Sequence, residues 1–240
     1  NVLDLPFLPL TSLDVMMAVH NAVYNHPSAK KALAKWNAHL YMPNVLPQYE
    51  YMGKGTPPAK VSDFKGKRLR ALGGMGRAAK AIGAVPTTMP ASETYTALSR
   101  GTVDAIGFPF TYTFSAYKLD EVADWYTTNM VLGTVNCPIV FNTSSWAKLP
   151  KQYQKLMNDL KAGASNAQKI AYSTKDKENL AKWAANPKLV GVKIDEAEMA
   201  EFRRIGGQPL WNDWVKENAK HIPAQELLDL VLKTAKEAAK

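Results

Sequence analysis

Short apolar runs alternate with helical patterns in the first half of the chain. The run 69–72 indicates a strand, and residues 77–82 indicate a helix. Between them stand three glycines, which predict a tight turn where strand and helix approach closely: Gly73, Gly74 and Gly76. Their free N–H groups could also meet an anion at the helix start, but the last glycine of a dinucleotide-binding motif is absent.

A second strand–helix step follows directly. Residues 86–90 indicate extended chain, Ser92 is placed to cap a helix over 93–100, and the apolar run 103–106 indicates the next strand. Strands and helices that alternate in this way predict an α/β lobe.

The pattern changes after Asn142 to one long helix that opens at Leu149-Pro150. Its apolar stripe has helical spacing: Tyr153, Leu156, Met157, Leu160, Ala164, Ala167 and Ala171. A helix that continues to Trp183 would span about 50 Å, more than one small lobe, so we expect it to bridge two lobes. A coiled coil is the alternative, but the alanine-rich stripe favours a buried backing helix.

The tail carries another amphipathic helix with an apolar side at Leu227, Leu228, Val231, Leu232 and Ala235. Its polar side mixes acids with lysines, which favours packing onto a lobe over binding to an anionic membrane.

Composition indicates a globular protein that is not inserted in a membrane. The chain has 240 residues, 46% of them hydrophobic, and no apolar stretch of about 18 residues. Cys137 is the one cysteine. The net charge of +9 comes from lysines dispersed among acids on predicted helix surfaces, so it favours attraction of anions over nucleic-acid binding.

Catalytic and metal-binding patterns are weak. The four histidines are scattered, without H-E-x-x-H spacing, and no G-x-S-x-G or phosphate-binding loop occurs. We therefore expect no metal, no cofactor and no enzymatic activity.

Residues 63–104 carry a long ordered motif. It resembles the signature of the solute-binding proteins of tripartite ATP-independent periplasmic (TRAP) transporters, the DctP family: D-L-K-G-x-K-x-R, then L-G-A-x-P, then S-E-x-Y-x-A-L-x-x-G-x-V-D-G. The matching positions are Asp63, Lys65, Gly66, Arg70, Gly83, Ala84, Pro86, Ser92, Glu93, Tyr95, Ala97, Leu98, Gly101, Val103 and Asp104. The resemblance continues at Leu5-Pro6-Phe7, at 118–122 (KLDEV) and at 142–150 (NTSSWAKLP).

The resemblance implies an α/β fold of the two-lobed periplasmic binding protein type (type II-like), with a long helix bridging both lobes. Lobe I would comprise residues 1–48 and 136–175, and lobe II residues 49–135 and 176–240, with the ligand cleft between them. Family members begin with a strand–helix–strand portion ahead of the L-P-F turn, so we expect the natural protein to carry further N-terminal residues.

The function implied by the resemblance is periplasmic capture of a small organic anion, a carboxylate or a sulfonate, and its delivery to the membrane subunits of a TRAP transporter. The binding protein itself would be a monomer. Two other functions stay open: a ligand sensor for a signalling receptor and, with less support, an α/β enzyme.

Arg70 is the first candidate for ligand binding. A guanidinium offers a planar fork that matches a carboxylate or sulfonate, and a strand fixes its direction. Most arginines are surface residues, but the resemblance places Arg70 on the family's arginine that pairs with the ligand's acidic group. Arg68, two residues away and thus on the same strand face, would join it or lie at the cleft edge.

Further ligand contacts are expected from an aromatic segment. Phe108 replaces an asparagine that contacts the ligand in some family members, and Tyr112 follows it. Alternation on a strand would place four aromatic residues on one side, as core packing would also do: Phe108, Phe110, Tyr112 and Phe114. We expect Phe110 and Phe114 in the core, and Phe108 and Tyr112 at the ligand, with an aromatic wall that favours a compact ligand with an apolar part.

Three further positions complete the predicted contacts. Asn136 would donate an amide hydrogen bond across the hinge, while its neighbour Cys137 is expected to be a small buried residue. Met89 and Ala91, ahead of the predicted helix 93–100, are the other two candidates.

Overall fold

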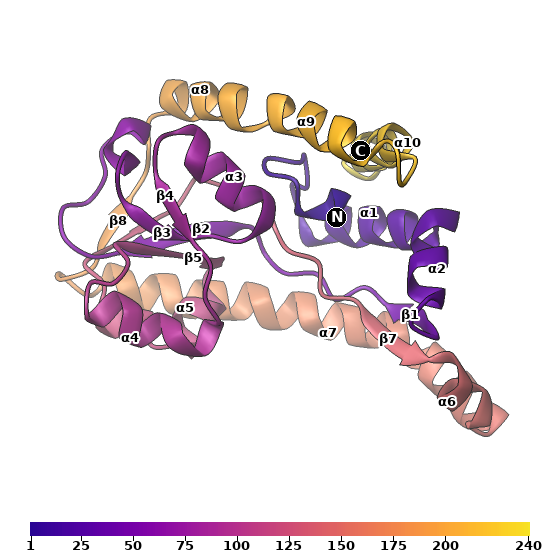
Figure 1. The fold of residues 1–240 in the computed structure, drawn as a ribbon. Coiled ribbons are helices and arrows are strands. Elements are labelled where there is room, and N and C mark those ends of the chain that lie inside the picture. The colour runs from indigo at the N-terminus through magenta and orange to yellow at the C-terminus, as the bar shows by residue number, and fades with distance from the viewer.

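A mixed six-stranded sheet forms the centre of the larger lobe in this computed structural model, which describes residues 1–240 (Figure 1). In spatial order, its strands are β4 (Val85–Thr87), β3 (Arg68–Arg70), β5 (Ala105–Pro109), β2 (Tyr49–Gly53), β6 (Trp125–Thr127) and β8 (Val190–Val192). Strand β3 is parallel to both of its neighbours, whereas β2 is antiparallel to β5 and β6.

Both faces of this sheet are covered by helices, and every residue of its central strands β5, β2 and β6 is buried. One face packs under α3 (Gly73–Ala81) and α8 (Glu196–Gly206). The other packs against α4 (Thr94–Ser99), α5 (Tyr112–Ala116) and the end of α7 (Lys151–Ala184). Short 3-10 turns connect these elements: η2 (Val61–Phe64), η3 (Ala91–Glu93) and η4 (Leu119–Glu121). The predicted α/β alternation is confirmed.

The smaller lobe is mainly helical. Its core joins η1 (Val2–Asp4), α1 (Leu13–Asn25), α9 (Gln208–Asn218) and α10 (Ala224–Ala238). It also contains α2 (Pro27–Ala34), α6 (Thr143–Lys148) and an antiparallel pair, β1 (Ala38–Met42) and β7 (Ile139–Asn142). The apolar side of α10 is buried against α1, as expected for lobe packing. Residues 176–240 were expected in the lobe of the sheet, but α10 packs onto α1 of the smaller lobe. The lobe boundaries stay a prediction.

Two segments cross between the lobes side by side. Residues 43–48 lead from β1 into β2, and residues 128–138 lead from β6 back to β7. The Tyr49 amide donates to the Gly133 carbonyl (2.8 Å), and the Thr134 hydroxyl donates to the Leu46 carbonyl (2.8 Å). We call these two stretches the interlobe segments.

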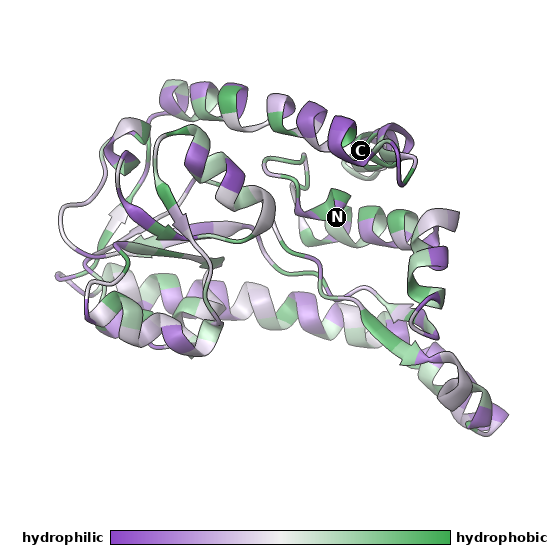
Figure 2. Ribbon diagram, viewed as in Figure 1, coloured by the Kyte–Doolittle hydropathy of each residue, from purple (hydrophilic) through white to green (hydrophobic).

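The long helix is present as predicted. Helix α7 starts directly after Pro150, has 34 residues, and runs from β7 past the underside of the sheet (Figure 1). The expected burial of its apolar stripe is wrong, because Tyr153 is 51% exposed and Leu160 57%. The fully buried residues of α7 are Asn179 and Trp183, near the end that packs against the sheet lobe. Strand β7, green in Figure 2, is also exposed at Ile139 and Val140.

The glycines at 73, 74 and 76 lie in the first turns of α3, not in a turn ahead of it. A Cβ on Gly74 would lie 2.2 Å from the Asp4 carbonyl oxygen, and Gly73 has φ +48°. The glycines therefore serve close packing of this helix against the segment Asp4–Pro6, and the helix starts four residues earlier than predicted.

Smaller differences concern element ends. The strand expected at 103–106 is β5, shifted to 105–109, and Ser92 lies in η3 without capping α4. The Thr94 hydroxyl instead donates to the Ala91 carbonyl (2.6 Å). None of the helices is long and apolar enough to cross a membrane.

Candidate functional site

Arg70 is a buried cation without a counter-anion. It ends strand β3, is 3% exposed, and donates from Nη1 to the Gly107 carbonyl (2.8 Å). Its Nε is buried and has no hydrogen-bond partner. Burial lowers the pKa of the guanidinium, and only the Tyr49 and Tyr117 hydroxyls oppose that shift. The site therefore holds a positive charge that no carboxylate of the chain neutralises.

The guanidinium lies over an aromatic ring. Its central carbon is 4.3 Å from the centre of the Phe108 ring, and Phe108 in turn stacks on Tyr117 at 5.4 Å. Phe108 belongs to the same buried cluster as Phe114, so it is a core residue and also the support of Arg70. The stretch is not one continuous strand, because β5 ends at Pro109 and both Tyr112 and Phe114 lie on α5, so the alternation that a strand would give does not apply.

The Tyr49 and Tyr117 hydroxyls lie near the arginine, and Tyr112 lies near Tyr49. Tyr49 is buried at the start of β2, and burial raises the pKa of its hydroxyl, a shift that the charge of Arg70 opposes and that Tyr112 adds to. Tyr112 is half-buried and packs on Tyr172 of α7, with 4.9 Å between ring centres. The Tyr49 and Tyr117 hydroxyls can donate or accept hydrogen bonds next to the cation.

Helix α7 anchors the connection from β5 to α5, directly ahead of Tyr112. The Thr111 amide donates to Asp176 Oδ1 (2.7 Å), as does the Thr111 hydroxyl (2.8 Å). Asn179 donates from Nδ2 to that hydroxyl (2.9 Å). This link fixes the loop after β5 to the long helix that spans both lobes.

Met89 and Ala91 are half-buried and pack against the cluster that contains Phe108. The structure thus brings these two candidates to the same sheet face as Phe108 and Arg70. Whether they touch a ligand stays a prediction.

Arg68 has a different environment from Arg70. It is exposed, and it forms an ion pair with Asp104, with Nη2 2.7 Å from Oδ1. Its hydrogen bond lowers the pKa of the Asp104 carboxyl. The Arg68 guanidinium is therefore engaged by a carboxylate of the chain, at the start of β3.

Asn136 lies in the interlobe segment and is bound by the smaller lobe. Its Nδ2 donates to Asp4 Oδ1 (3.0 Å), and its Oδ1 accepts from the Tyr24 hydroxyl. The structure does not bring its amide to Arg70. Cys137 beside it is exposed, so its expected burial is wrong.

Sequence reasoning missed Tyr49, Tyr172 and Asp176. Each lies far along the chain from the residue it supports, and none belongs to a recognisable motif. The one signal was the strand pattern at 49–51, Tyr-Glu-Tyr, which puts a carboxylate between two aromatic residues of a buried strand.

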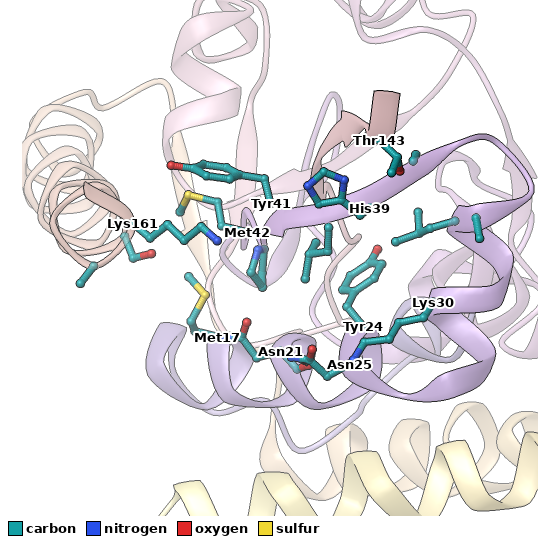
Figure 3. A pocket seen from close by; sticks show the side chains of 17 residues that line it. Met17, Asn21, Tyr24, Asn25, Lys30, His39, Tyr41, Met42, Thr143 and Lys161 are labelled. Atoms are coloured by element: carbon teal, nitrogen blue, oxygen red, sulfur yellow. Dashed lines mark hydrogen bonds between the residues drawn. The ribbon is translucent and has the colours of Figure 1, made fainter. Parts of the chain in front are cut away.

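A sizeable cavity lies elsewhere. It has a volume of about 700 Å³ within the smaller lobe, between α1, β1 and α7 (Figure 3). None of the predicted site residues lines it. Its lysines include Lys161, which lies 4.5 Å from the Tyr41 ring centre. Arg70 stays the candidate for ligand binding, because a buried, unpaired guanidinium needs an anion, whereas lysines beside a cavity do not.

No cluster of three or more histidine, cysteine, aspartate or glutamate side chains that could hold a metal ion lies anywhere in residues 1–240. The chemistry available at Arg70 is therefore that of one fixed cation, neutral hydroxyls and aromatic surface, which suits binding of an acid.

Comparison with curated proteins gives two partial relatives. A monocarboxylate 2-oxoacid-binding periplasmic protein of Nostoc sp. is 29% identical over 102 residues, which cover 40% of this chain and 27% of that protein. A solute-binding protein of Albidiferax ferrireducens is 26% identical over 188 residues, covering 75% of this chain and 53% of that protein. The chain thus spans about half, or less, of the length of these relatives.

Solved structures show the same fold. A TRAP solute-binding protein of Rhodoferax ferrireducens, in complex with copurified benzoate, has a TM-score of 0.86 at 18% identity, covering 99% of this chain and 74% of that one. The ectoine-binding protein of the Halomonas elongata TeaABC transporter has a TM-score of 0.83 at 21% identity, and the match covers 98% of this chain and 76% of that one. A TRAP binding protein of Shewanella oneidensis with bound succinate has a TM-score of 0.79 at 20% identity, and the match covers 98% of this chain and 74% of that one.

These likenesses confirm the predicted two-lobed α/β fold with its long helix. The family model for bacterial extracellular solute-binding proteins, family 7, matches residues 1–218, which confirms the resemblance drawn from the motifs. The chain belongs to this family, DctP, whose members are solute-binding proteins of transport systems.

Proposed function

We propose that the protein binds a small organic anion, a carboxylate or a sulfonate, between its lobes in the periplasm and presents it to the membrane subunits of a TRAP transporter. The observation that carries this proposal is the buried guanidinium of Arg70, which has no counter-anion in the chain.

The charge of Arg70 explains why the ligand should be an anion. Burial of an unpaired cation is costly, and the chain offsets that cost only with the Gly107 carbonyl, the Phe108 ring and nearby hydroxyls. A ligand carboxylate would supply the missing charge and accept from the free Nε. Two oxygens of one acid group match the guanidinium fork, which gives direction as well as affinity.

The surroundings favour a ligand with an apolar part. Phe108, Met89 and Ala91 share one sheet face with Arg70, and Tyr112 and Tyr172 add aromatic surface. The structural neighbours include proteins with bound benzoate and succinate and also with bound galacturonate and glucuronate, so the choice between these acids rests on the lining of this chain. An acid with a compact apolar body fits this lining better than a polyhydroxylated sugar acid, which would need more polar partners.

Capture requires motion and no chemical step. The interlobe segments and α7 connect the lobes, so a hinge movement about them would close the site over the ligand. The acid would leave unchanged when the lobes open at the transporter.

Mass spectrometry of freshly purified protein tests this function. The protein is analysed under native conditions and then denatured, and the released compounds are identified. We expect an organic acid in the wild type and its loss in Arg70→Gln, while Arg68→Gln retains it. A neutral ligand, or equal retention by Arg70→Gln, would refute the proposed role of Arg70.

A further inference from the structure

Glu50 is a buried carboxyl group at the joint between the lobes. It is the second residue of β2, where the chain enters the sheet from the first interlobe segment, and it is 3% exposed. Its Oε2 accepts from the Thr127 hydroxyl (2.5 Å) and the Met130 amide (3.0 Å), and its Oε1 accepts from the Val131 amide (2.9 Å).

Two of these three donors belong to the other interlobe segment. Met130 and Val131 begin the path from the sheet back to β7, so one side chain links the incoming and outgoing connections. Val131 has φ +45°, a left-handed conformation that a β-branched residue avoids unless its surroundings enforce it. The carboxyl of Glu50 accepts the N–H of this strained residue and so helps to hold the turn.

No cation compensates this carboxyl. It faces the Thr127 hydroxyl from β6, the two amides of residues 130 and 131, and Phe108, its register partner on β5. On its own strand the ionisable neighbour is the Tyr51 hydroxyl, whose pKa is raised by burial and by Glu50. Arg70 of β3 lies against the Phe108 ring, one strand further on, and forms no ion pair or hydrogen bond with Glu50.

We propose that Glu50 is a positioning residue that ties the start of β2, directly after the first interlobe segment, to the second interlobe segment, and that its protonation state sets how easily this joint opens. This inference concerns the joint itself and so goes beyond ligand capture. An effect of the joint on closure of the lobes over a ligand would rest on the proposed function.

The direction of the effect follows from linkage. Burial raises the pKa of Glu50 to about 7, while its three hydrogen bonds oppose that rise. When the joint opens and water reaches the carboxyl, the pKa returns toward its ordinary value of 4.5. The proton therefore binds the tied joint more tightly than the open one, and rising pH favours opening. For full exposure, the opening equilibrium should rise about tenfold from pH 6 to pH 8.

Hydrogen exchange in the ligand-free full chain tests the proposal. Exchange at the Met130 and Val131 amides is measured at pH 6 and pH 8 and corrected for the intrinsic rate at each pH. We expect about tenfold lower protection at pH 8 in the wild type, and no such change in Glu50→Gln. Glu50→Gln also loses hydrogen bonds, because a glutamine cannot accept all three, and this alone changes its protection at any one pH. The informative quantity is therefore the change in protection between pH 6 and pH 8.

Glu198→Gln is the matched control. Its carboxylate also accepts a backbone amide, that of Val61 (3.0 Å), but away from the interlobe segments, so this variant should keep the wild-type pH dependence. A pH dependence retained in Glu50→Gln would assign it to another group and overturn the proposal.

A second measurement needs no variant. Carbon-13 NMR of the glutamate carboxyl groups should show one that titrates near pH 7 together with the amide signals of residues 130 and 131. A protein in which every glutamate titrates below pH 5 would contradict the proposal. Neither experiment uses a ligand, so both outcomes are independent of whether the protein binds an organic acid.

Discussion

The central guanidinium carbon of Arg70 lies 4.3 Å from the centre of the Phe108 ring. The two residues come from adjacent strands, β3 and β5, and the same guanidinium donates to the Gly107 carbonyl on β5. A cation above an aromatic face is attracted by the ring quadrupole, and this attraction strengthens where water is excluded. Arg70 is thus held in direction before any ligand arrives, which lowers the ordering cost of binding.

Replacement of Arg70 by alanine should strongly weaken binding of the acid identified by mass spectrometry. Removal of one partner of a buried ion pair costs about 3–5 kcal/mol. Affinity should then fall by roughly two to four orders of magnitude, measured by titration calorimetry. Arg70→Lys keeps the charge but loses the planar fork, so it should bind more weakly than the wild type and better than Arg70→Ala.

The control for Arg70 is Arg68→Ala. The Arg68 guanidinium is exposed and paired with Asp104, so its loss should change affinity by less than about threefold, as for most exposed ion pairs. If Arg68→Ala lost as much affinity for the acid as Arg70→Ala, the loss would reflect a general effect of positive charge and not a specific contact of Arg70.

The Phe108→Leu variant should weaken acid binding while leaving the fold in place. Leucine keeps an apolar side chain in the buried cluster but removes the ring below Arg70. Cation–π contacts at desolvated sites contribute about 2 kcal/mol, so affinity should fall by up to roughly thirtyfold. Calorimetry gives the affinity, and thermal unfolding reports any loss of stability.

Phe114→Leu is matched to that variant. Phe114 belongs to the same cluster and lies 6.1 Å from the Phe108 ring, but it does not contact Arg70. It should lower stability to a similar extent and leave affinity nearly unchanged. Equal losses of affinity in both variants would mean that core packing, and not the ring under the guanidinium, determines binding.

Much of the fold could be predicted from local pattern. Buried strands between glycine and proline breaks, and a helix with an uninterrupted 3.6-residue period, are signals that the chain carries within a few residues. Helix α7 was predicted to begin after Pro150 and does so. Its burial was not predictable, because exposure of Leu160 depends on which element packs over that turn, and the stripe itself does not encode this.

The site could be predicted only where a motif marks it. Arg70 stands in a recognisable sequence, whereas Asp176 supports Thr111 from 65 residues away in the chain. The start of α3 was misplaced for a related reason. Gly73 and Gly74 look like a turn locally, but the close approach of Asp4 explains why glycine is needed inside the helix.

His20 should make the protein less stable in acid. It is completely buried, neither ring nitrogen has a partner, and burial lowers its pKa to about 4. The unfolded chain takes up the proton near pH 6.5, so the contribution of neutral His20 is present above that pH and is lost as pH falls toward 4. The free energy of unfolding falls by about 3 kcal/mol over this range, at 1.36 kcal/mol per pKa unit.

Urea unfolding at pH 7 and pH 4.5 measures this effect, with His20→Leu as the comparison. Leucine has no group to protonate, so the variant should be more stable than the wild type at pH 4.5 by about 2–3 kcal/mol and similar to it at pH 7. Glu50 acts in the opposite direction, because its raised pKa adds stability as pH falls from about 7 to 4.5, but it does so equally in both proteins. An equal pH slope in wild type and variant would exclude His20 as the source.

Two glycine-to-alanine substitutions in helices should have opposite effects on stability. A Cβ on Gly74 would lie 2.2 Å from the Asp4 carbonyl oxygen and 2.8 Å from Pro6 Cδ, and a backbone oxygen cannot turn away as a side chain can. Helix α3 and the segment Asp4–Pro6 must therefore separate, at a cost of about 1–3 kcal/mol, as in other overpacked sites. A Cβ on Gly163 of α7 would meet no atom within 4 Å, so alanine there should stabilise the helix by about 0.5–1 kcal/mol. Urea unfolding of both variants gives the two free energies of unfolding. Stabilisation by Gly74→Ala would mean that helix propensity outweighs the contact with Asp4, and that the close approach of α3 to this segment is not what requires glycine at position 74.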